Sequence, residues 1–317
     1  MSYHHLTIEE RACIDVYYKQ GLSVSKIALL LDRNKSTISR ELKRNANDRG
    51  NYNPIGAQRK YVVRRRACGR IAILETNPYI LALVCDGLSK YFSPEQISNT
   101  LPKGKRICFS TIYRAIRQKI IPSEYHAKLR RYGKRLKHRG KTKGMAYDFS
   151  QVRSISQRPS SICNRNRYGH WELDTIVLRK ESGCHLATFV ERKSRMAIIR
   201  KIDNKKAETM SDTIIDAMSS VPSHLVKTFT VDRGLEFTDW RRVEKELNAK
   251  VYFCDPYSPH QRGTNENTNG LIRQFFPRRT ILPVITNEFV KEAEVLLNNR
   301  PRKCLGWNTP YERFYRL

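Results

Sequence analysis

The sequence is poor in acidic residues and contains no long apolar run. It has 30 Asp and Glu against 60 Lys and Arg, a formal net charge of +30 over 317 residues. No apolar stretch approaches the ~18 residues of a membrane-spanning helix. The first residues, with His4, His5, Glu9 and Glu10, lack the features of a signal peptide. We therefore expect neither a membrane protein nor a secreted one, and the sequence favours a cytoplasmic location.

Cysteine pairs are also missing. The eight cysteines, at positions 13, 68, 85, 108, 163, 184, 254 and 304, form no Cys-x-x-Cys motif and stand singly in largely apolar segments. This pattern is typical of reduced cysteines and matches no structural zinc site. We expect no zinc and no small-molecule cofactor.

The excess of positive charge is concentrated in the first half of the chain. Residues 1–150 contain 31 Lys and Arg against 11 Asp and Glu, whereas residues 151–317 contain 29 against 19. Such a field attracts polyanions, because neutralised phosphates release their condensed counterions. Double-stranded DNA is the expected partner. The alternative from charge alone is a basic protein that binds acidic membrane or ribosomal RNA without specificity.

Residues 1–50 have the pattern of a helix-turn-helix DNA-binding domain. Thr7-Ile-Glu-Glu10 predicts the start of a first helix, Ser23 caps a second, and a third begins near Lys35. In the third helix Ile38 and Leu42 face the core, which leaves a polar outer face for base edges and phosphates. The residues expected to contact DNA are Lys35, Ser36, Thr37, Ser39, Arg40, Lys43 and Arg44. The alternative is a basic three-helix structural domain.

A second copy of this pattern lies in residues 51–127. Ser93-Pro-Glu-Gln-Ile-Ser98 predicts a helix start, and Ser110-Thr-Ile-Tyr-Arg-Ala-Ile116 aligns with Ser36-Thr-Ile-Ser-Arg-Glu-Leu42. We expect a second helix-turn-helix-like domain in which Ser110, Thr111 and Arg114 contact DNA. Residues 128–164 follow as a basic linker, since residues 128–143 hold nine Lys and Arg and no acid.

From residue 165 onwards the pattern becomes that of an α/β domain. Residues 171–178, 184–191 and 196–201 read as an antiparallel meander of strands. A helix (206–219), a strand (228–231), a helix (238–247), a strand (251–254) and a helix near Asn265 follow. The expected fold is thus a multidomain protein, with all-α helix-turn-helix domains before a mixed five-stranded sheet covered by helices over residues 165–317.

Three carboxylates in this domain suit metal-dependent chemistry. Asp174 lies on the first strand, Asp232 follows the fourth, and Glu266 lies in the first turn of the last helix. Carboxylate oxygens bind Mg²⁺ or Mn²⁺, and two such ions activate the attacking oxygen and stabilise the leaving oxygen of a phosphodiester. Each acid alone has a structural alternative, as a strand end, a turn residue or a helix N-terminal acid. His260 and Arg262, on the loop before Glu266, could contact phosphate.

The sequence resembles a bacterial insertion-sequence transposase of the insertion-sequence-thirty family, of DDE type with a ribonuclease-H-like, integrase-type core. The resemblance covers nearly the whole chain. The motifs that carry it are Leu6-Thr-Ile-Glu-Glu-Arg11, Ser36-Thr-Ile-Ser-Arg-Glu-Leu42, Gly169-His-Trp-Glu-Leu-Asp174, Tyr257-Ser-Pro-His-Gln-Arg-Gly-Thr-Asn-Glu-Asn267 and Leu297-Asn-Asn-Arg-Pro-Arg302. The chain departs from many relatives at Arg233, where they have Asn, and at His260, where they have Trp.

The resemblance implies that Asp174, Asp232 and Glu266 are the catalytic acids and bind about two Mg²⁺ or Mn²⁺ ions. It implies binding to the terminal inverted repeats of an insertion sequence, hydrolysis of one strand, and attack of the freed 3′-hydroxyl on target DNA. Because two ends must be held together, a homodimer or larger oligomer on nucleoid DNA is expected. The alternatives are a non-enzymatic helix-turn-helix regulator and, more remotely, a tyrosine recombinase.

Overall fold

The computed structural model describes residues 4–46, 51–68, 71–130, 151–178, 185–256, 258–277 and 285–316. It forms two compact units, Met1–Ala72 and Ile73–Leu317. Most of the expected basic linker, residues 131–150, lies outside the described residues. No helix in the described ranges is both long enough and apolar enough to cross a membrane.

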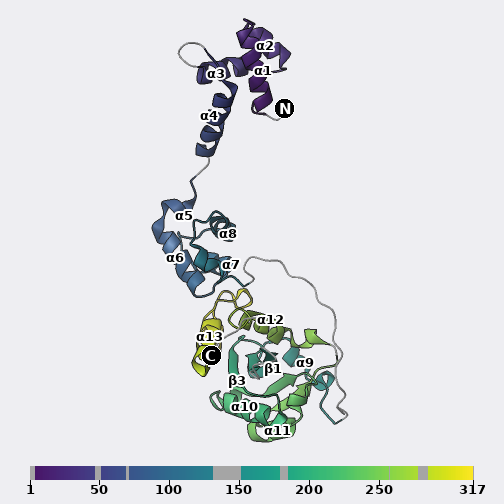
Figure 1. Cartoon of the computed structure of the whole chain (residues 1–317). Helices are drawn as coiled ribbons and strands as arrows, with labels where there is room; N and C mark the ends of the chain where they lie inside the picture. Colours follow the sequence, from purple (N-terminus) through teal and green to yellow (C-terminus); the bar gives the residue numbers. More distant parts are fainter. Residues whose placement is uncertain are drawn as a thin grey trace. The chain divides into compact units, whose positions relative to one another are not determined.

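The first unit is built from four helices (Figure 1). They are α1 (Ile8–Lys19), α2 (Val24–Leu30), α3 (Lys35–Asn45) and α4 (Pro54–Ala67). Thr7 forms the expected capping box with Glu10, and Ser23 and Asn34 accept backbone hydrogen bonds at the starts of α2 and α3. Helices α1 to α3 surround a core that includes Ile14, Ile27 and Ile38, none of which is accessible to solvent. The three predicted helices are present.

The first unit extends beyond the expected boundary at residue 50, because α4 packs against α1 and α3. Polar contacts hold it there. Arg11 of α1 pairs with the buried Glu41 of α3 at 2.8 Å and donates to Gln58 of α4 at 2.6 Å. The hydroxyl of Tyr52, just before α4, donates to the same Glu41 carboxylate at 3.0 Å. The finer division into domains 1–50, 51–127, 128–164 and 165–317 stays a prediction.

The second unit begins with four further helices. They are α5 (Ile73–Thr76), α6 (Pro78–Ser89), α7 (Pro94–Thr100) and α8 (Phe109–Arg117). They enclose their own apolar core, in which Ile97 and Ile112 are buried. Ser93 forms a capping box with Gln96 at the start of α7, as the Ser-Pro-Glu-Gln sequence predicts. The expected second helical cluster with a long turn between its last two helices is present.

The rest of the second unit is a five-stranded mixed sheet with helices on both faces (Figure 1). The strands are β1 (His170–Val177), β2 (His185–Glu191), β3 (Ala197–Ile202), β4 (Thr228–Val231) and β5 (Lys250–Phe253). Their order is β3-β2-β1-β4-β5. The first three strands pair antiparallel, and β4 lies parallel to both β1 and β5. The predicted meander and mixed sheet are thus observed.

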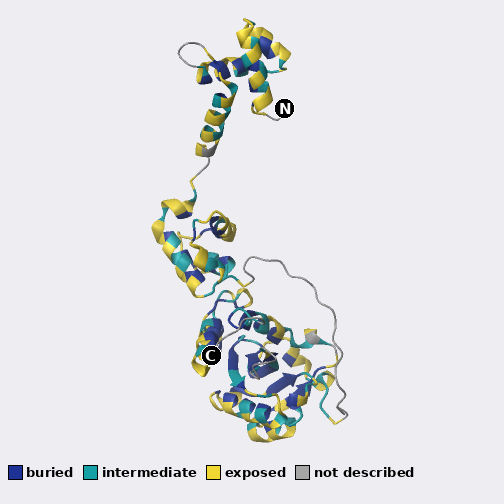
Figure 2. Cartoon of the chain, viewed as in Figure 1, coloured by how far each residue is buried: buried dark blue, intermediate teal, exposed yellow. Residues whose placement is uncertain are grey.

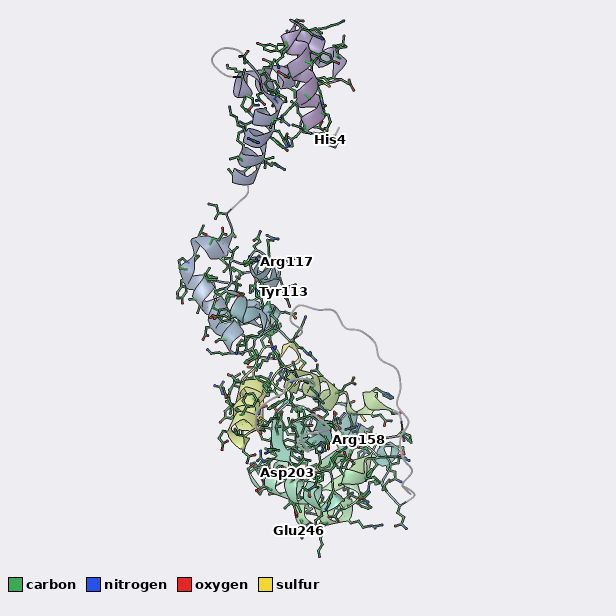
Figure 3. All side chains as sticks on the ribbon, viewed as in Figure 1. His4, Tyr113, Arg117, Arg158, Asp203 and Glu246 are labelled. Atoms are coloured by element: carbon green, nitrogen blue, oxygen red, sulfur yellow. The ribbon has the colours of Figure 1, made fainter. Side chains whose placement is uncertain are left out.

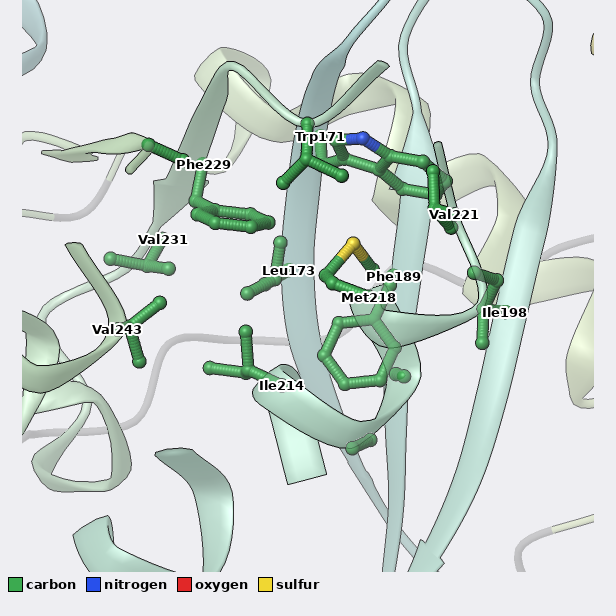
Figure 4. Packing of buried hydrophobic residues seen from close by; sticks show 14 of the residues in the cluster. Trp171, Leu173, Phe189, Ile198, Ile214, Met218, Val221, Phe229, Val231 and Val243 are labelled. Atoms are coloured by element: carbon green, nitrogen blue, oxygen red, sulfur yellow. The ribbon is translucent and has the colours of Figure 1, made fainter. Parts of the chain in front are cut away.

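Two separate apolar cores cover the faces of this sheet. Against one face pack α10 (Ala207–Ser219), α11 (Trp240–Leu247) and α14 (Pro310–Tyr315). Figure 4 shows this core around Trp171, Phe189 and Phe229, which are fully buried. Against the other face pack α12 (Gly263–Ile272) and α13 (Asn287–Asn298). Burial on both faces explains why the strands are mostly dark blue in Figure 2, and it makes the sheet a rigid support for the residues at its edge.

Candidate active site and DNA-reading helices

Asp174 on β1 and Asp232, directly after β4, lie at the same level of the sheet. In the parallel β1–β4 ladder His170 is opposite Thr228 and Glu172 is opposite Thr230. Asp174 and Asp232 each come two residues after the last of these pairs, and residues two apart share a face of a strand. The sheet therefore brings the two predicted carboxylates together although 58 positions separate them in the sequence.

A single guanidinium group bridges these two carboxylates. Nη1 of Arg262 lies 3.2 Å from Oδ1 of Asp174, and Nη2 lies 2.7 Å from Oδ2 of Asp232. Nη1 also donates to the carbonyl oxygen of Leu173 at 2.8 Å. Arg262 ends the short 3₁₀ helix η6 (Pro259–Arg262) that leads into α12. The position between the two acids is thus a binding site for positive charge.

The ionisation of these groups depends on that bridge. Burial raises the pKa of Asp232 above its ordinary value, while the positive charge of Arg262 acts in the opposite direction. Burial alone would lower the pKa of Arg262, but Asp174 and Asp232 outweigh it, and its pKa is raised. The positive charge of Arg262 therefore favours the ionised form of Asp232.

Helix α12 is attached to β1 through a buried acid. Glu172, fully buried, forms a salt bridge with Arg192 at 3.0 Å. Its other oxygen, Oε2, accepts a hydrogen bond from the backbone N–H of Asn265 at 2.9 Å. A buried carboxylate is stable only when it is paired and hydrogen-bonded, and both conditions are met here. Glu172 thus connects β1 to the start of α12.

Asn269, one turn further along α12, contacts the active site directly. Its Nδ2 donates to Oδ2 of Asp174 at 2.8 Å, and its Oδ1 accepts from the hydroxyl of Thr188 on β2 at 3.1 Å. The same hydroxyl lies within 3.3 Å of Oδ1 of Asn265. Sequence reasoning missed these residues. The four-residue spacing of the two asparagines, which puts them on one helix face, was the available signal.

Glu266 lies on α12 but its side chain is exposed. It follows Arg262 by four residues and precedes Asn269 by three, so it shares the face of the helix from which both of these reach Asp174. Among the described residues, no three His, Cys, Asp or Glu side chains converge as a metal site. The structure therefore joins two of the three predicted acids and places the third on the adjacent helix turn.

The loops next to the two aspartates carry His260 and Arg233, which differ in their contacts. His260 is exposed on η6, and Nε of Arg233 donates to the carbonyl oxygen of Cys254 at 3.2 Å. Behind Asp232 the backbone N–H of Gly234 donates to Oδ1 at 3.0 Å. A Cβ at position 234 would lie 2.9 Å from this oxygen and 2.5 Å from Oε2 of Glu236, so a larger residue there would displace a carboxylate.

The two predicted reading helices, α3 and α8, present the same residue types in the same way. Ile38 and Ile112 are fully buried, whereas Ser36 and Ser110, and Arg40 and Arg114, are exposed. The other predicted contacts are also exposed or half-buried: Lys35, Thr37, Ser39, Lys43, Arg44 and Thr111. Figure 3 shows Tyr113 and Arg117 on the same helix as Arg114. All predicted contact residues are therefore accessible, and contact with DNA stays a prediction.

The donor set suits a hard divalent cation. Asp174 and Asp232 supply carboxylate oxygens that already share one positively charged group, and Glu266 lies on the adjacent helix face. Oxygen ligands of this kind are those that Mg²⁺ and Mn²⁺ take in proteins. The chemistry of the residues present fits such an ion.

Comparison with known proteins agrees with this architecture. A helix-turn-helix domain family matches residues 2–45, and the integrase core domain family matches residues 164–259. The chain is 37% identical to the transposase InsI for insertion sequence element IS30C of Escherichia coli (strain K12), over 97% of this chain and 82% of that protein. It is also 37% identical to the transposase for insertion sequence element IS4351 of Bacteroides fragilis, over 99% of this chain and 96% of that protein.

Among solved structures, the catalytic core domain of BIV integrase aligns with a TM-score of 0.39 and 20% identity, over 47% of this chain and 95% of that one. The matched domain families confirm the predicted order, a helix-turn-helix domain followed by an integrase-like core. By its identity to relatives of similar length, the chain belongs to the family of the IS30 insertion-sequence transposases.

Proposed function

We propose that this chain is a DNA transposase that binds the terminal inverted repeats of its insertion sequence, cuts one strand there and joins it to target DNA. One observation carries the proposal. Asp174 and Asp232 meet at one level of a rigid parallel strand pair and share a single cationic group, the guanidinium of Arg262. In a basic chain that attracts DNA, paired acids of this kind suit phosphodiester chemistry.

Asp174, Asp232 and Glu266 would hold Mg²⁺ or Mn²⁺, with two ions per active site. When bound, the ions would supply the Lewis acidity that activates the attacking oxygen and stabilises the leaving oxygen. The protein's part is to keep the two aspartates at one level of the sheet and to keep α12 beside them. Glu172 performs the second task by binding the backbone of Asn265, and Asn269 orients the carboxylate of Asp174.

Arg262 has two roles in this proposal. With no metal present it neutralises Asp174 and Asp232, and it must leave them when a divalent cation takes its place. Once released, its guanidinium is free to bind a DNA phosphate as a two-pronged donor. His260, exposed on the same short helix, would lie beside the same phosphate.

DNA selection is assigned to the exposed faces of α3 and α8. Each begins with hydroxyl side chains and carries an arginine one turn later, an arrangement that suits base edges and phosphates. Two ends must be joined in one reaction, so the active form on DNA would be at least a dimer. Light scattering of the protein with its terminal DNA would give that stoichiometry.

The test uses duplexes that carry the inverted repeats flanking this protein's own gene. Asp232→Asn should bind these duplexes as the wild type does and lose all cleavage and joining in Mg²⁺ or Mn²⁺. The matched control is Asp203→Asn, which removes one exposed carboxylate at the end of β3 (Figure 3) and should leave all steps intact. Retained cleavage by Asp232→Asn would overturn the proposal. A wild-type protein that binds the repeats but never cuts them would favour the non-enzymatic regulator.

A further inference from the structure

The second unit contains a cavity lined by positive charge, apart from the carboxylates of the active site. Its volume is about 500 Å³. Four cationic side chains line it: Lys128, Arg130, Arg300 and Arg302. No acidic side chain is among its lining residues. We call this cavity the arginine pocket.

Of the two inner arginines, Arg300 is buried and Arg302 is half-buried, and neither has a carboxylate partner among the described residues. Arg300 is 3% exposed and donates to the neutral oxygens of Gln96 and Gln274, both at 2.9 Å. Arg302 donates to the carbonyl oxygen of Leu297 at 3.1 Å, and its Nε is buried without a hydrogen-bond acceptor. In the part of the chain that the structure describes, neither guanidinium forms a salt bridge. The nearby acid Glu95 pairs with Lys303 instead, at 2.9 Å.

Keeping both arginines charged in this cavity is unfavourable unless an anion binds them. Burial, and then the positive charges of Arg302 and Arg130, lower the pKa of Arg300 to about 9. Burial likewise lowers the pKa of Arg302 to about 10. Buried arginines normally persist because a carboxylate or phosphate pairs with them. Here the protein supplies several donors and leaves the counter-charge to a ligand.

The outer cations extend the pocket toward the catalytic helix. Nζ of Lys128 donates to the neutral hydroxyl of Tyr91 at 3.0 Å, and it forms no salt bridge within the described ranges of the chain. Arg130 lies against α12, since a Cβ at Gly270 would be 2.5 Å from its Nη2. The basic sequence continues beyond it through residue 143.

The pocket lies between a reading helix and the catalytic helix. Asn267 and Leu271 of α12 line one side, and Asn267 directly follows the catalytic candidate Glu266. Tyr113 of α8, labelled in Figure 3, lines it as well and is the residue just before Arg114. A DNA strand that passes from α8 to the active site would therefore cross this pocket.

We propose that the arginine pocket binds a backbone phosphate of the DNA that runs between α8 and the active site. Planar guanidinium groups match phosphate oxygens with paired hydrogen bonds, and the buried setting strengthens each contact. The inference rests on the DNA-binding part of the proposed function and is independent of the metal chemistry.

The test compares single-charge variants of the full chain in EDTA, with a mixed-sequence duplex of about 40 base pairs as the probe. Log affinity falls as log salt concentration rises. Arg302→Gln and Arg130→Gln should each make this negative slope shallower by roughly 0.9, the value for one lost phosphate contact. Lys245→Gln is the matched control, because Lys245 is exposed on α11 and its loss removes the same charge. Its slope should equal that of the wild type.

A purely structural role predicts different results. If Arg302 only stabilised the fold, Arg302→Gln would lower the melting temperature and leave the salt slope unchanged, which would overturn the proposal. We expect instead an equal or higher melting temperature without DNA, since the substitution relieves repulsion among buried like charges. If Arg302→Gln fails to fold, the substitution of the exposed Arg130 provides the test. An unchanged salt slope in Arg130→Gln would then overturn the proposal.

The two proposals can fail separately. Asp232→Asn in EDTA should retain the wild-type salt slope, because it leaves the arginine pocket intact. Cleavage by Asp232→Asn would therefore reject the catalytic assignment alone, whereas unchanged slopes in the pocket variants would reject only the pocket.

Discussion

The carboxylate of Glu172 accepts a hydrogen bond from the backbone N–H of Asn265 at 2.9 Å, which fixes the start of α12 to the central strand of the sheet. Because Glu172 lies two residues before Asp174, one strand carries both a catalytic candidate and the attachment of the neighbouring helix. Arg192, whose side chain is 5% exposed, completes this buried contact.

Replacing Glu172 tests this attachment. Glu172→Gln leaves Arg192 as an uncompensated buried charge, so the free energy of unfolding should fall by about 3–5 kcal/mol. Urea denaturation followed by circular dichroism measures the change. Glu246→Gln removes an equivalent but exposed carboxylate on α11 (Figure 3) and should change stability by less than about 0.5 kcal/mol. Equal effects of the two substitutions would contradict the role of Glu172.

His170 should make the protein sensitive to acid. Burial, and then the nearby charges of Lys227 and Arg192, lower its pKa from 6.5 to about 4. The unfolded chain therefore binds a proton below about pH 6.5 that the folded chain takes up only near pH 4. Stability from this group is complete above pH 6.5 and is lost as the pH falls toward 4, by at most about 3 kcal/mol.

Urea denaturation at a series of pH values from 7 to 4 measures that loss. His170→Gln should flatten the dependence of unfolding free energy on pH in this range, although it also loses the contact with the Thr228 hydroxyl at 2.9 Å. His224→Gln, at an exposed position, should leave the dependence as it is. If the unfolding free energy of His170→Gln depended on pH as in the wild type, the acid sensitivity would come from other groups.

Two glycines near the active site should respond oppositely to alanine. A Cβ at position 234 would lie 2.9 Å from Oδ1 of Asp232 and 2.5 Å from Oε2 of Glu236, so Gly234→Ala must displace a carboxylate. We expect strand cleavage to slow by about 10- to 100-fold with DNA binding retained. At Gly263, the first residue of α12, a Cβ would have no neighbour within 4 Å.

Gly263→Ala is therefore the matched control. It should cut DNA at the normal rate, and its free energy of unfolding should rise by about 0.4–1 kcal/mol, because alanine reduces the entropy of the unfolded chain. Single-turnover cleavage assays and urea denaturation measure both quantities. Equal loss of cleavage in the two variants would show that the space around Asp232 is not the cause.

The two reading helices should recognise separate parts of the DNA. Arg40 is oriented along α3 by hydrogen bonds to the backbone oxygen and hydroxyl of Ser36, at 2.9 and 2.7 Å. Arg40→Ala and Arg114→Ala should each cost about 1–3 kcal/mol in binding to the terminal repeat, with protection lost over different base pairs in footprinting. Identical footprints for the two variants would refute the division between α3 and α8.

The acidic pair could be predicted from the sequence because its causes are local. Asp174 lies on a short apolar strand and Asp232 directly follows another, and the order of strands and helices places those strands side by side. The resemblance of α3 and α8 could also be predicted, since the buried Ile38 and Ile112 are flanked by equivalent polar residues in the sequence. Local pattern and strand order were therefore enough to predict that these two acids lie close together.

The contacts that complete the site could not be predicted in this way. Arg262 reaches Asp174 across 88 positions, and Asn269 reaches it across 95, so both depend on how α12 packs on the finished sheet. The extension of the first compact unit beyond residue 50 has a similar reason. Helix α4 joins α1 through polar contacts of Arg11 and Gln58, which leave no apolar stripe in the sequence.

The contact of Arg300 with Gln96 has a consequence for where the DNA is cut. Arg300 follows α13 of the catalytic domain, and Gln96 belongs to α7, which packs against α8. The candidate reading helix α8 and the two candidate catalytic acids thus belong to one compact unit. Under the proposed function, the distance along the DNA from the sequence contacted by α8 to the cleaved bond would therefore be fixed.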